Sequence, residues 1–307
     1  MSWSEHAFSF ACAGETLVGI VSTPDGVVAD TGVVVIVGGP QYRAGSHRQF
    51  TLLARAVASA GFAVLRFDVR GMGDSTGARR DFEAVNEDVA AAIDALQEQL
   101  PAVRRVVLWG LCDGASATLL YLHATNDPRV QGLCLANPWV RTEAGLARAH
   151  IKHYYLQRLT QPEFWRKVLS GRVASKAAGE LWHNLSRSLS RDDGHGTGGP
   201  NAARAAPFQE RMADAAAGFG GKLLLLVSGD DMTAKEFLEH VHQDMRWRSV
   251  LGRDGTSRCD FAHADHTFSD RDLLGTLLQS TTNWLRGLDG QSIHTRHADS
   301  AEASTRA

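Results

Sequence analysis

Short β-branched runs alternate with helical patterns along most of the chain. The run Val33–Val37 has no polar alternation and ends in a Gly-Gly-Pro turn, as expected for a strand buried on both faces. Such alternation favours an α/β fold with a mostly parallel sheet flanked by helices. The pattern predicts, in order, strands Phe8–Cys12, Leu17–Ser22 and Val33–Val37, helix Phe50–Ala60, strand Phe62–Val69, helix Asp81–Leu100, strand Arg105–Trp109, helix Ala115–Ala124, strands Val130–Ala136 and Lys222–Val227, a helix from Thr233, strand Arg258–Ala262 and helix Asp272–Leu285.

The alternation stops after Trp139. From Arg141 to Gly220 the sequence reads as helical, mixes aromatic with basic residues, and contains the glycine-rich polar stretch SRDDGHGTGGPN. This segment predicts an inserted helical cap with a flexible loop in its middle. Residues 1–140 and 221–288 then form the predicted core, and the polar, aperiodic residues 289–307 predict a disordered tail.

Composition narrows the class of protein. The 307 residues are 44% hydrophobic and 21% charged, as in ordinary soluble enzymes and binding proteins. With 32 basic and 34 acidic residues, the net charge of −2 supplies no field that would hold nucleic acid. No apolar run approaches the roughly 18 residues that cross a bilayer, and the first residues do not resemble a secretion signal. We therefore expect a cytoplasmic protein without a transmembrane segment, and its four widely spaced cysteines favour reduced thiols.

Two stretches fit the pattern of a nucleophile elbow. The literal Gly-x-Ser-x-Gly match is 73–77, but Ser75 lies six residues beyond the strand ending at Val69 and is followed by polar sequence. An elbow needs a buried strand that runs directly into a tight turn and a helix. The segment Gly110–Gly114, with Cys112 at its centre, has that context, so Ser75 is interpreted as part of a turn.

Cys112 is the predicted nucleophile. At the start of a helix, the partial positive charge of the helix dipole lowers the pKa of a thiol and favours the thiolate. The alternative is an inert, buried cysteine, the common fate of a free thiol. The neighbouring Asp113 supports that alternative, because a nearby negative charge opposes thiolate formation.

A cysteine nucleophile needs a base and an acid that orients it. Asp230 and Asp231 follow the strand that ends at Val227, and of the two Asp231 is preferred because a helix begins just after it. His263 and His266 lie in the loop before the last helix, and His266 is preferred because it adjoins that helix. The order nucleophile, acid, histidine is that of α/β-hydrolase triads.

The oxyanion hole requires two backbone donors. One is predicted to be the N–H of Asp113, and the other that of Gly39, with Gln41 as the alternative because Pro40 cannot donate. Gln41, Arg43 and Arg48 follow in the same turn and are candidate substrate-binding residues, the arginines for an anionic group. The histidines lack further ligands at suitable spacing, so neither a metal nor a cofactor is predicted.

Five segments carry a specific resemblance: GGPQYRAGSHRQF, DVRGMGDSTG, GLCDGAS, SGDDMTAKEF and DHTFS. Together they resemble the α/β-hydrolase superfamily, and in particular the type 1 hydrolases associated with exosortase A systems. The resemblance implies an eight-stranded α/β-hydrolase core and a link to exopolysaccharide production and protein sorting. It also assigns the triad positions to Cys112, Asp231 and His266.

These residues favour a hydrolase that cleaves an acyl ester or thioester through an acyl-enzyme intermediate. The expected partner is a small-molecule substrate, or an acyl group linked to a lipid or sugar, and the oligomeric state is not predicted. Two alternatives stay open. One is an acyltransferase with the same intermediate, and the other is a non-catalytic scaffold that keeps the fold for contacts with partner proteins.

Overall fold

An eight-stranded sheet organises the described part of the chain. The computed structural model describes residues 2–141 and 206–304, with the backbone alone for 289–304. The strand order is β1-β2-β4-β3-β5-β6-β7-β8. The strands are β1 (Trp3–Cys12), β2 (Glu15–Pro24), β3 (Thr31–Ile36), β4 (Val64–Phe67), β5 (Arg105–Leu111), β6 (Val130–Ala136), β7 (Lys222–Ser228) and β8 (Thr256–Phe261).

The strands from β3 to β8 run parallel, as the sequence predicts. β3 pairs with β4 and β5, and the parallel pairing continues through β6 and β7 to β8. β2 is antiparallel to both β1 and β4, which confirms the predicted opening hairpin. Because parallel strands end at a common edge, the loops after β3, β5, β6, β7 and β8 meet on one side of the molecule.

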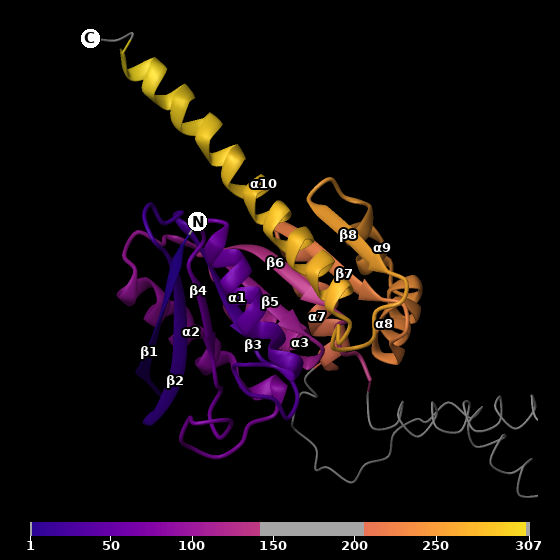
Figure 1. The fold of residues 1–307 in the computed structure, drawn as a ribbon. Helices are drawn as coiled ribbons and strands as arrows, with labels where there is room; N and C mark the ends of the chain where they lie inside the picture. The colour runs from indigo at the N-terminus through magenta and orange to yellow at the C-terminus, as the bar shows by residue number, and fades with distance from the viewer. Residues whose placement is uncertain (1, 142–205, 305–307) are drawn as a thin grey trace, which may run out of the picture. The chain divides into compact units, whose positions relative to one another are not determined.

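Helices cover both faces of the sheet (Figure 1). On one face α1 (Gln49–Ser59) packs beside α10 (Arg271–Ser304) over Val33 and Val35 of β3. Val34 and Ile36 point the other way, into a second apolar cluster. This explains the unbroken β-branched run in β3. The helices of the second face are α2 (Asn86–Gln99), α3 (Asp113–Thr125), α7 (Phe208–Gly218), α8 (Met232–Gln243) and α9 (Met245–Gly252).

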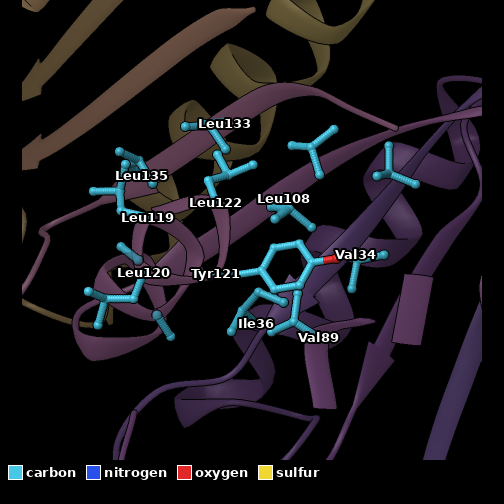
Figure 2. Packing of buried hydrophobic residues seen from close by; sticks show 14 of the residues in the cluster. Val34, Ile36, Val89, Leu108, Leu119, Leu120, Tyr121, Leu122, Leu133 and Leu135 are labelled. Atoms are coloured by element: carbon cyan, nitrogen blue, oxygen red, sulfur yellow. The ribbon is translucent and has the colours of Figure 1, made fainter. Parts of the chain in front are cut away.

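The helix after β5 is deeply buried. Every residue of α3 from Gly114 to Leu122 is buried, so this helix is enclosed on all sides. Figure 2 shows the ring of Tyr121 among Val34, Ile36 and neighbouring apolar side chains. The Tyr121 hydroxyl donates a hydrogen bond to Asp127 Oδ2 at 2.6 Å, which satisfies its polar end. A helix fixed in this way holds its first residue, and the turn before it, in one position.

The structure differs from the predicted boundaries at two places. Residues 208–218 lie within the predicted cap, but they form α7, which packs on α3 and α9 through Met212, Ala213 and Ala216 and belongs to the same compact unit as the sheet. The rest of the predicted cap lies outside the described residues, apart from Arg141. The tail predicted to be disordered from residue 289 continues α10 as far as Ser304, where no proline or glycine beyond Gly290 interrupts a helix.

None of the described helices is both long and apolar enough to cross a membrane.

Candidate active site

Cys112 lies in a strained turn between β5 and α3. Its backbone angles, φ 61° and ψ −127°, fall in a region that residues with a side chain rarely adopt. Neighbouring backbone groups hold the turn in place. The Cys112 N–H donates to the carbonyl of Ala136 at 2.9 Å, and its own carbonyl accepts from the N–H of Ala115 at 3.0 Å and from that of Trp139 at 3.2 Å. The turn has the geometry that exposes a nucleophile at the first turn of a helix.

Glycines allow the backbone to approach this turn closely. A Cβ atom on Gly110 would lie 2.5 Å from the carbonyl oxygen of Gly114, and one on Gly114 would lie 2.4 Å from that of Ile36. A Cβ atom on Gly38 would lie 2.4 Å from the backbone nitrogen of Gly114. The two glycines that flank Cys112 are therefore required by packing, as the elbow motif predicts.

Ser75 occupies a different kind of turn. Its hydroxyl donates to the carbonyl of Asp68 at 2.7 Å and accepts from the N–H of Val18 at 2.9 Å. These two hydrogen bonds connect the loop after β4 to β2, so the Ser75 hydroxyl stabilises the turn. The interpretation of 73–77 as a turn agrees with this geometry.

The acid and the histidine meet at the carboxyl ends of β7 and β8. Asp231 Oδ2 lies 2.8 Å from His266 Nδ1. The same carboxylate caps α8, since it accepts the N–H groups of Thr233 at 3.0 Å and Ala234 at 3.2 Å. Asp231 is almost fully buried, with 6% of its side chain exposed against 32% for His266. Two buried N–H donors therefore fix the orientation of the carboxylate that holds the imidazole.

The alternative residues are not part of this contact. Asp230 is exposed, and its backbone N–H donates to the carbonyl of Ala264 at 3.0 Å. His263 is also exposed. Of the four acids and histidines considered in these two loops, the structure brings together Asp231 and His266.

His266 is held in its protonated form. The hydrogen bond from Asp231 and a hydrogen bond with Cys112 raise the pKa of His266 to about 10, although burial acts in the opposite direction. At neutral pH the ring is then an imidazolium that faces a carboxylate on one side and the Cys112 sulfur on the other. Electrostatic attraction to Cys112 contributes to the same shift. This arrangement suits a thiolate–imidazolium pair.

The predicted oxyanion donors lie next to the Cys112 turn. Gly39 has a left-handed φ of 63°, a conformation that favours glycine, and no atom would meet a Cβ there within 4 Å. The N–H groups of Gly39, Gly114 and Asp113 face the Asp113 carboxyl and oppose the effect of burial, which dominates and raises the pKa of that carboxyl. The shift favours the neutral form of Asp113. It weakens the argument that this residue opposes a thiolate at Cys112.

Two of the three candidate substrate-binding residues, Gln41 and Arg43, form hydrogen bonds or ion pairs with other residues of the protein. Arg43 forms ion pairs with Asp68 and, at 2.6 Å, with Asp74, and its backbone N–H donates to Asp68 Oδ1 at 2.6 Å. The Gln41 side-chain carbonyl accepts the N–H of Ser46 at 3.0 Å. Arg48 is exposed at the N-terminus of α1, in a left-handed conformation. Nearby carboxylates neutralise the charge of Arg43, and its contact with an anionic substrate group stays a prediction.

Asn137 belongs to the site, and the sequence reasoning missed it. This fully buried residue follows β6, and its Nδ2 donates to Ser228 Oγ at 2.8 Å and, over a longer 3.5 Å, to the His266 carbonyl. Its Oδ1 accepts the Ser228 N–H at 2.9 Å. Asn137 thereby joins the loops that carry Asp231 and His266. The signal available in the sequence is an asparagine followed by a proline at the end of a buried strand.

Within the described residues, no group of three or more histidine, cysteine, aspartate or glutamate side chains is placed to hold a metal ion.

A strained turn after β5, a carboxylate after β7 and a histidine after β8, all on one edge of a mostly parallel eight-stranded sheet, define an α/β-hydrolase. Its family follows from the sequence. The chain belongs to the family described as serine aminopeptidase, S33, whose model matches residues 29–232. The matched segment includes Cys112 and Asp231 and ends before His266. No curated protein matches the chain.

Solved structures share the fold at low sequence identity. The esterase Pf2001 of Pyrococcus furiosus is 14% identical, with a TM-score of 0.60 and 92% of each chain covered. Est1E of Butyrivibrio proteoclasticus, solved with ferulic acid bound, is 13% identical, with a TM-score of 0.58 over 92% of this chain and 98% of that one. The serine hydrolase XC6422 of Xanthomonas campestris, described as having no lid, is 16% identical, with a TM-score of 0.53 over 92% and 95%. At these identities the likeness establishes the fold alone.

Proposed function

We propose that this α/β-hydrolase cleaves acyl esters or thioesters with Cys112 as nucleophile, His266 as acid and base, and Asp231 as the residue that orients His266. The observation that carries the proposal is the strained Cys112 turn at the start of α3, with the protonated His266 held between Asp231 and the sulfur. The family description and the fold shared with the esterase Pf2001 support the reaction class. The family description names a serine, whereas the proposed nucleophile of this chain is Cys112.

The reaction proceeds in two halves. The Cys112 thiolate attacks the acyl carbon, a C–S bond forms, and the carbonyl electron pair moves to oxygen. The N–H groups of Gly39 and Asp113, which face the Asp113 carboxyl in the free protein, then turn to bind the oxyanion. Collapse of this intermediate breaks the bond to the leaving group, which takes its proton from the His266 imidazolium. An acyl-thioester and a neutral imidazole remain.

Water completes the turnover. Acylation removes the negative charge of the thiolate, so one cause of the raised pKa of His266 is lost and the imidazole becomes a better base. His266 takes a proton from water as the oxygen attacks the acyl carbon. The C–S bond then breaks, the acid leaves, and the thiolate–imidazolium pair is restored. If an alcohol or amine replaces water in this step, the same intermediate gives acyl transfer.

Substitution of the two candidate nucleophiles tests the proposal. Cys112→Ala is expected to reduce turnover of activated acyl esters and thioesters by at least about 1,000-fold, since removal of a nucleophile leaves little beyond binding and oxyanion stabilisation. Ser75→Ala is expected to keep most of the activity, because Ser75 ties a turn to β2. Undiminished turnover in Cys112→Ala would refute the mechanism.

Alkylation separates this proposal from the scaffold alternative. Iodoacetamide at pH 7 is expected to label Cys112 rapidly in the native protein and to leave Cys134 unlabelled, because Cys134 is fully buried and burial raises its pKa. Mass spectrometry of the digested protein reads out both sites. Equal, slow labelling of the two cysteines would favour a non-catalytic scaffold.

We also propose, on the five sequence segments alone, that the enzyme serves the exopolysaccharide and exosortase systems whose type 1 hydrolases it resembles. Deletion of the gene in an organism that carries such a system should alter its exopolysaccharide or the processing of its sorted proteins. A Cys112→Ala copy should fail to restore either property.

A further inference from the structure

A cavity of about 300 Å³ lies next to the oxyanion turn, between the end of β3, the loop from β4 to α2 and the start of α3. Its walls include the buried side chains of Val37, Val69 and Val85. Gly39 and Asp113, which carry the two proposed oxyanion donors, line it as well. One water molecule takes a share of roughly 30 Å³ in the liquid, so the space corresponds to about ten water-sized groups.

The mouth of this cavity is basic. Arg79 and Arg80 line it and are exposed, and within the described residues neither lies at ion-pair distance from a carboxylate. Other arginines of the same region are neutralised, since Arg43 pairs with Asp68 and Asp74, and Arg70 with Glu87 and Asp88. Two guanidinium groups are thus available at the entrance of a cavity whose walls include several apolar side chains.

Two acidic residues also line the cavity and reduce this positive charge. Asp81 Oδ1 accepts the N–H of Glu83 at 3.0 Å, so part of its charge is used to cap the short 3₁₀ helix Phe82–Ala84 (η2). Burial favours the neutral form of Asp113, and the charge of Asp81 acts in the same direction. Two guanidinium groups therefore outweigh the one carboxylate of Asp81 at the entrance, and on the inner wall burial raises the pKa of Asp113.

The position of His266 assigns this cavity to one half of the substrate. In the proposed reaction His266 donates its proton to the leaving group, so the leaving group must lie on the His266 side of the scissile bond. The described residues that line the cavity include none from the loops after β7 and β8, and they do not include Cys112; the cavity meets the site through Gly39 and Asp113 of the oxyanion turn. A cavity away from the His266 loop suits the acyl half of the substrate better than the leaving group.

We propose that this cavity binds the acyl half of the substrate and that Arg79 and Arg80 recognise a carboxylate at the far end of that acyl chain. The preferred substrates are then short ω-carboxyacyl esters or thioesters, of about the length of a glutaryl group. Guanidinium groups bind carboxylates with two parallel hydrogen bonds, which gives both charge and direction to the contact. The inference rests on the proposed acyl-transfer chemistry at Cys112 for its orientation.

The kinetic test compares a glutaryl thioester with the same thioester whose free carboxylate is methylated. The native enzyme should prefer the free carboxylate, and the Arg79→Ala/Arg80→Ala double variant should lose about 10- to 100-fold in kcat/KM on it while changing by less than about threefold on the methyl ester. Arg104→Ala is the matched control. Arg104 is also exposed but directly precedes β5, at the opposite edge of the sheet, so the Arg104→Ala variant should behave as the native enzyme does.

A binding measurement keeps this inference separate from the chemistry. Calorimetry with the Cys112→Ala protein should detect glutarate monomethyl ester, whose free carboxylate stands in for that of the substrate, and the signal should vanish when Arg79 and Arg80 are also replaced. Retained binding in that triple variant, or equal kinetic losses on both thioesters, would overturn the assignment. If no thioester is turned over by the native enzyme while glutarate monomethyl ester binds through the arginines, the proposed function fails and the anion site stands.

Discussion

Replacing Asp231 with asparagine removes its charge while keeping its role as a helix cap. Asparagine is as good an N-cap as aspartate, and its side-chain oxygen can still accept an N–H at the start of α8. The negative charge 2.8 Å from His266 Nδ1 is lost. The substitution therefore tests the electrostatic contribution of the acid without unfolding the helix that carries it.

The structure gives the expected magnitude. The pKa of His266 is raised from 6.5 to about 10, and the hydrogen bond with Asp231 is the largest cause. An ionised partner shifts a pKa by about 1 to 3, so the Asp231→Asn protein should titrate with a midpoint between about 7 and 9. The adjacent Asp230→Asn substitution should leave the midpoint near 10, because exposed Asp230 does not contribute to the shift.

Proton NMR of the imidazole ring measures this midpoint directly. The chain has 13 histidines, and a His266→Gln variant assigns the resonance. The interaction stabilises the folded state most fully below pH 6.5 and is lost as the pH rises through about 10, because the folded pKa lies above the unfolded one. The loss of unfolding free energy in Asp231→Asn should accordingly shrink between pH 7 and pH 10. A midpoint that moves in Asp230→Asn and stays in Asp231→Asn would refute the assignment.

Two further substitutions test how the site is built. Asn137→Ala leaves the buried N–H of Ser228 without its acceptor and should lower the unfolding free energy, measured by urea denaturation, by about 1 to 3 kcal/mol. Because Asn137 also contacts the His266 carbonyl, kcat should fall as the His266 loop is displaced. A loss below about 0.5 kcal/mol would contradict this role. Gly38→Ala should destabilise more than Gly39→Ala, because a Cβ at Gly38 meets the Asp113 carboxyl at 2.0 Å whereas one at Gly39 has free space. Thermal unfolding of the two proteins compares them, and an equal loss would count against the tight packing of the turn.

The sheet and the Cys112 turn were predictable because their signals are local. A strand buried on both faces needs consecutive apolar residues, as in Val33–Val37, and a tight strand-to-helix turn needs the glycines at 110 and 114. The order of the loops along the chain then places Asp231 and His266 at the same edge of the sheet as Cys112. Periodicity and turn chemistry carry all of this information.

Long-range partners were not predictable in the same way. From the sequence alone, Arg43 is predicted to be an unpaired cation in a loop. Its charge is neutralised in part by Asp68, which lies 25 residues further along the sequence. The assignment of 208–218 to the cap follows from the break in alternation, but the packing of Met212 against the core decides where that helix belongs. α9 was missed because it has only eight residues, although Asp244 caps it and Trp247 is fully buried beneath it. Each of these features depends on contacts that the local pattern does not encode.

The electrostatics of the site explain why cysteine suits this turn. A serine hydroxyl must lose its proton to a neutral imidazole during attack, and an imidazole with a pKa of about 10 is protonated in nearly every molecule at pH 7. A thiol gives up its proton far more readily, so the protonated His266 can coexist with an attacking thiolate and already carries the proton that the leaving group needs. Cys112 is itself one cause of the raised pKa of His266. With a serine at residue 112, the same Asp231 and His266 would have to work as a conventional base.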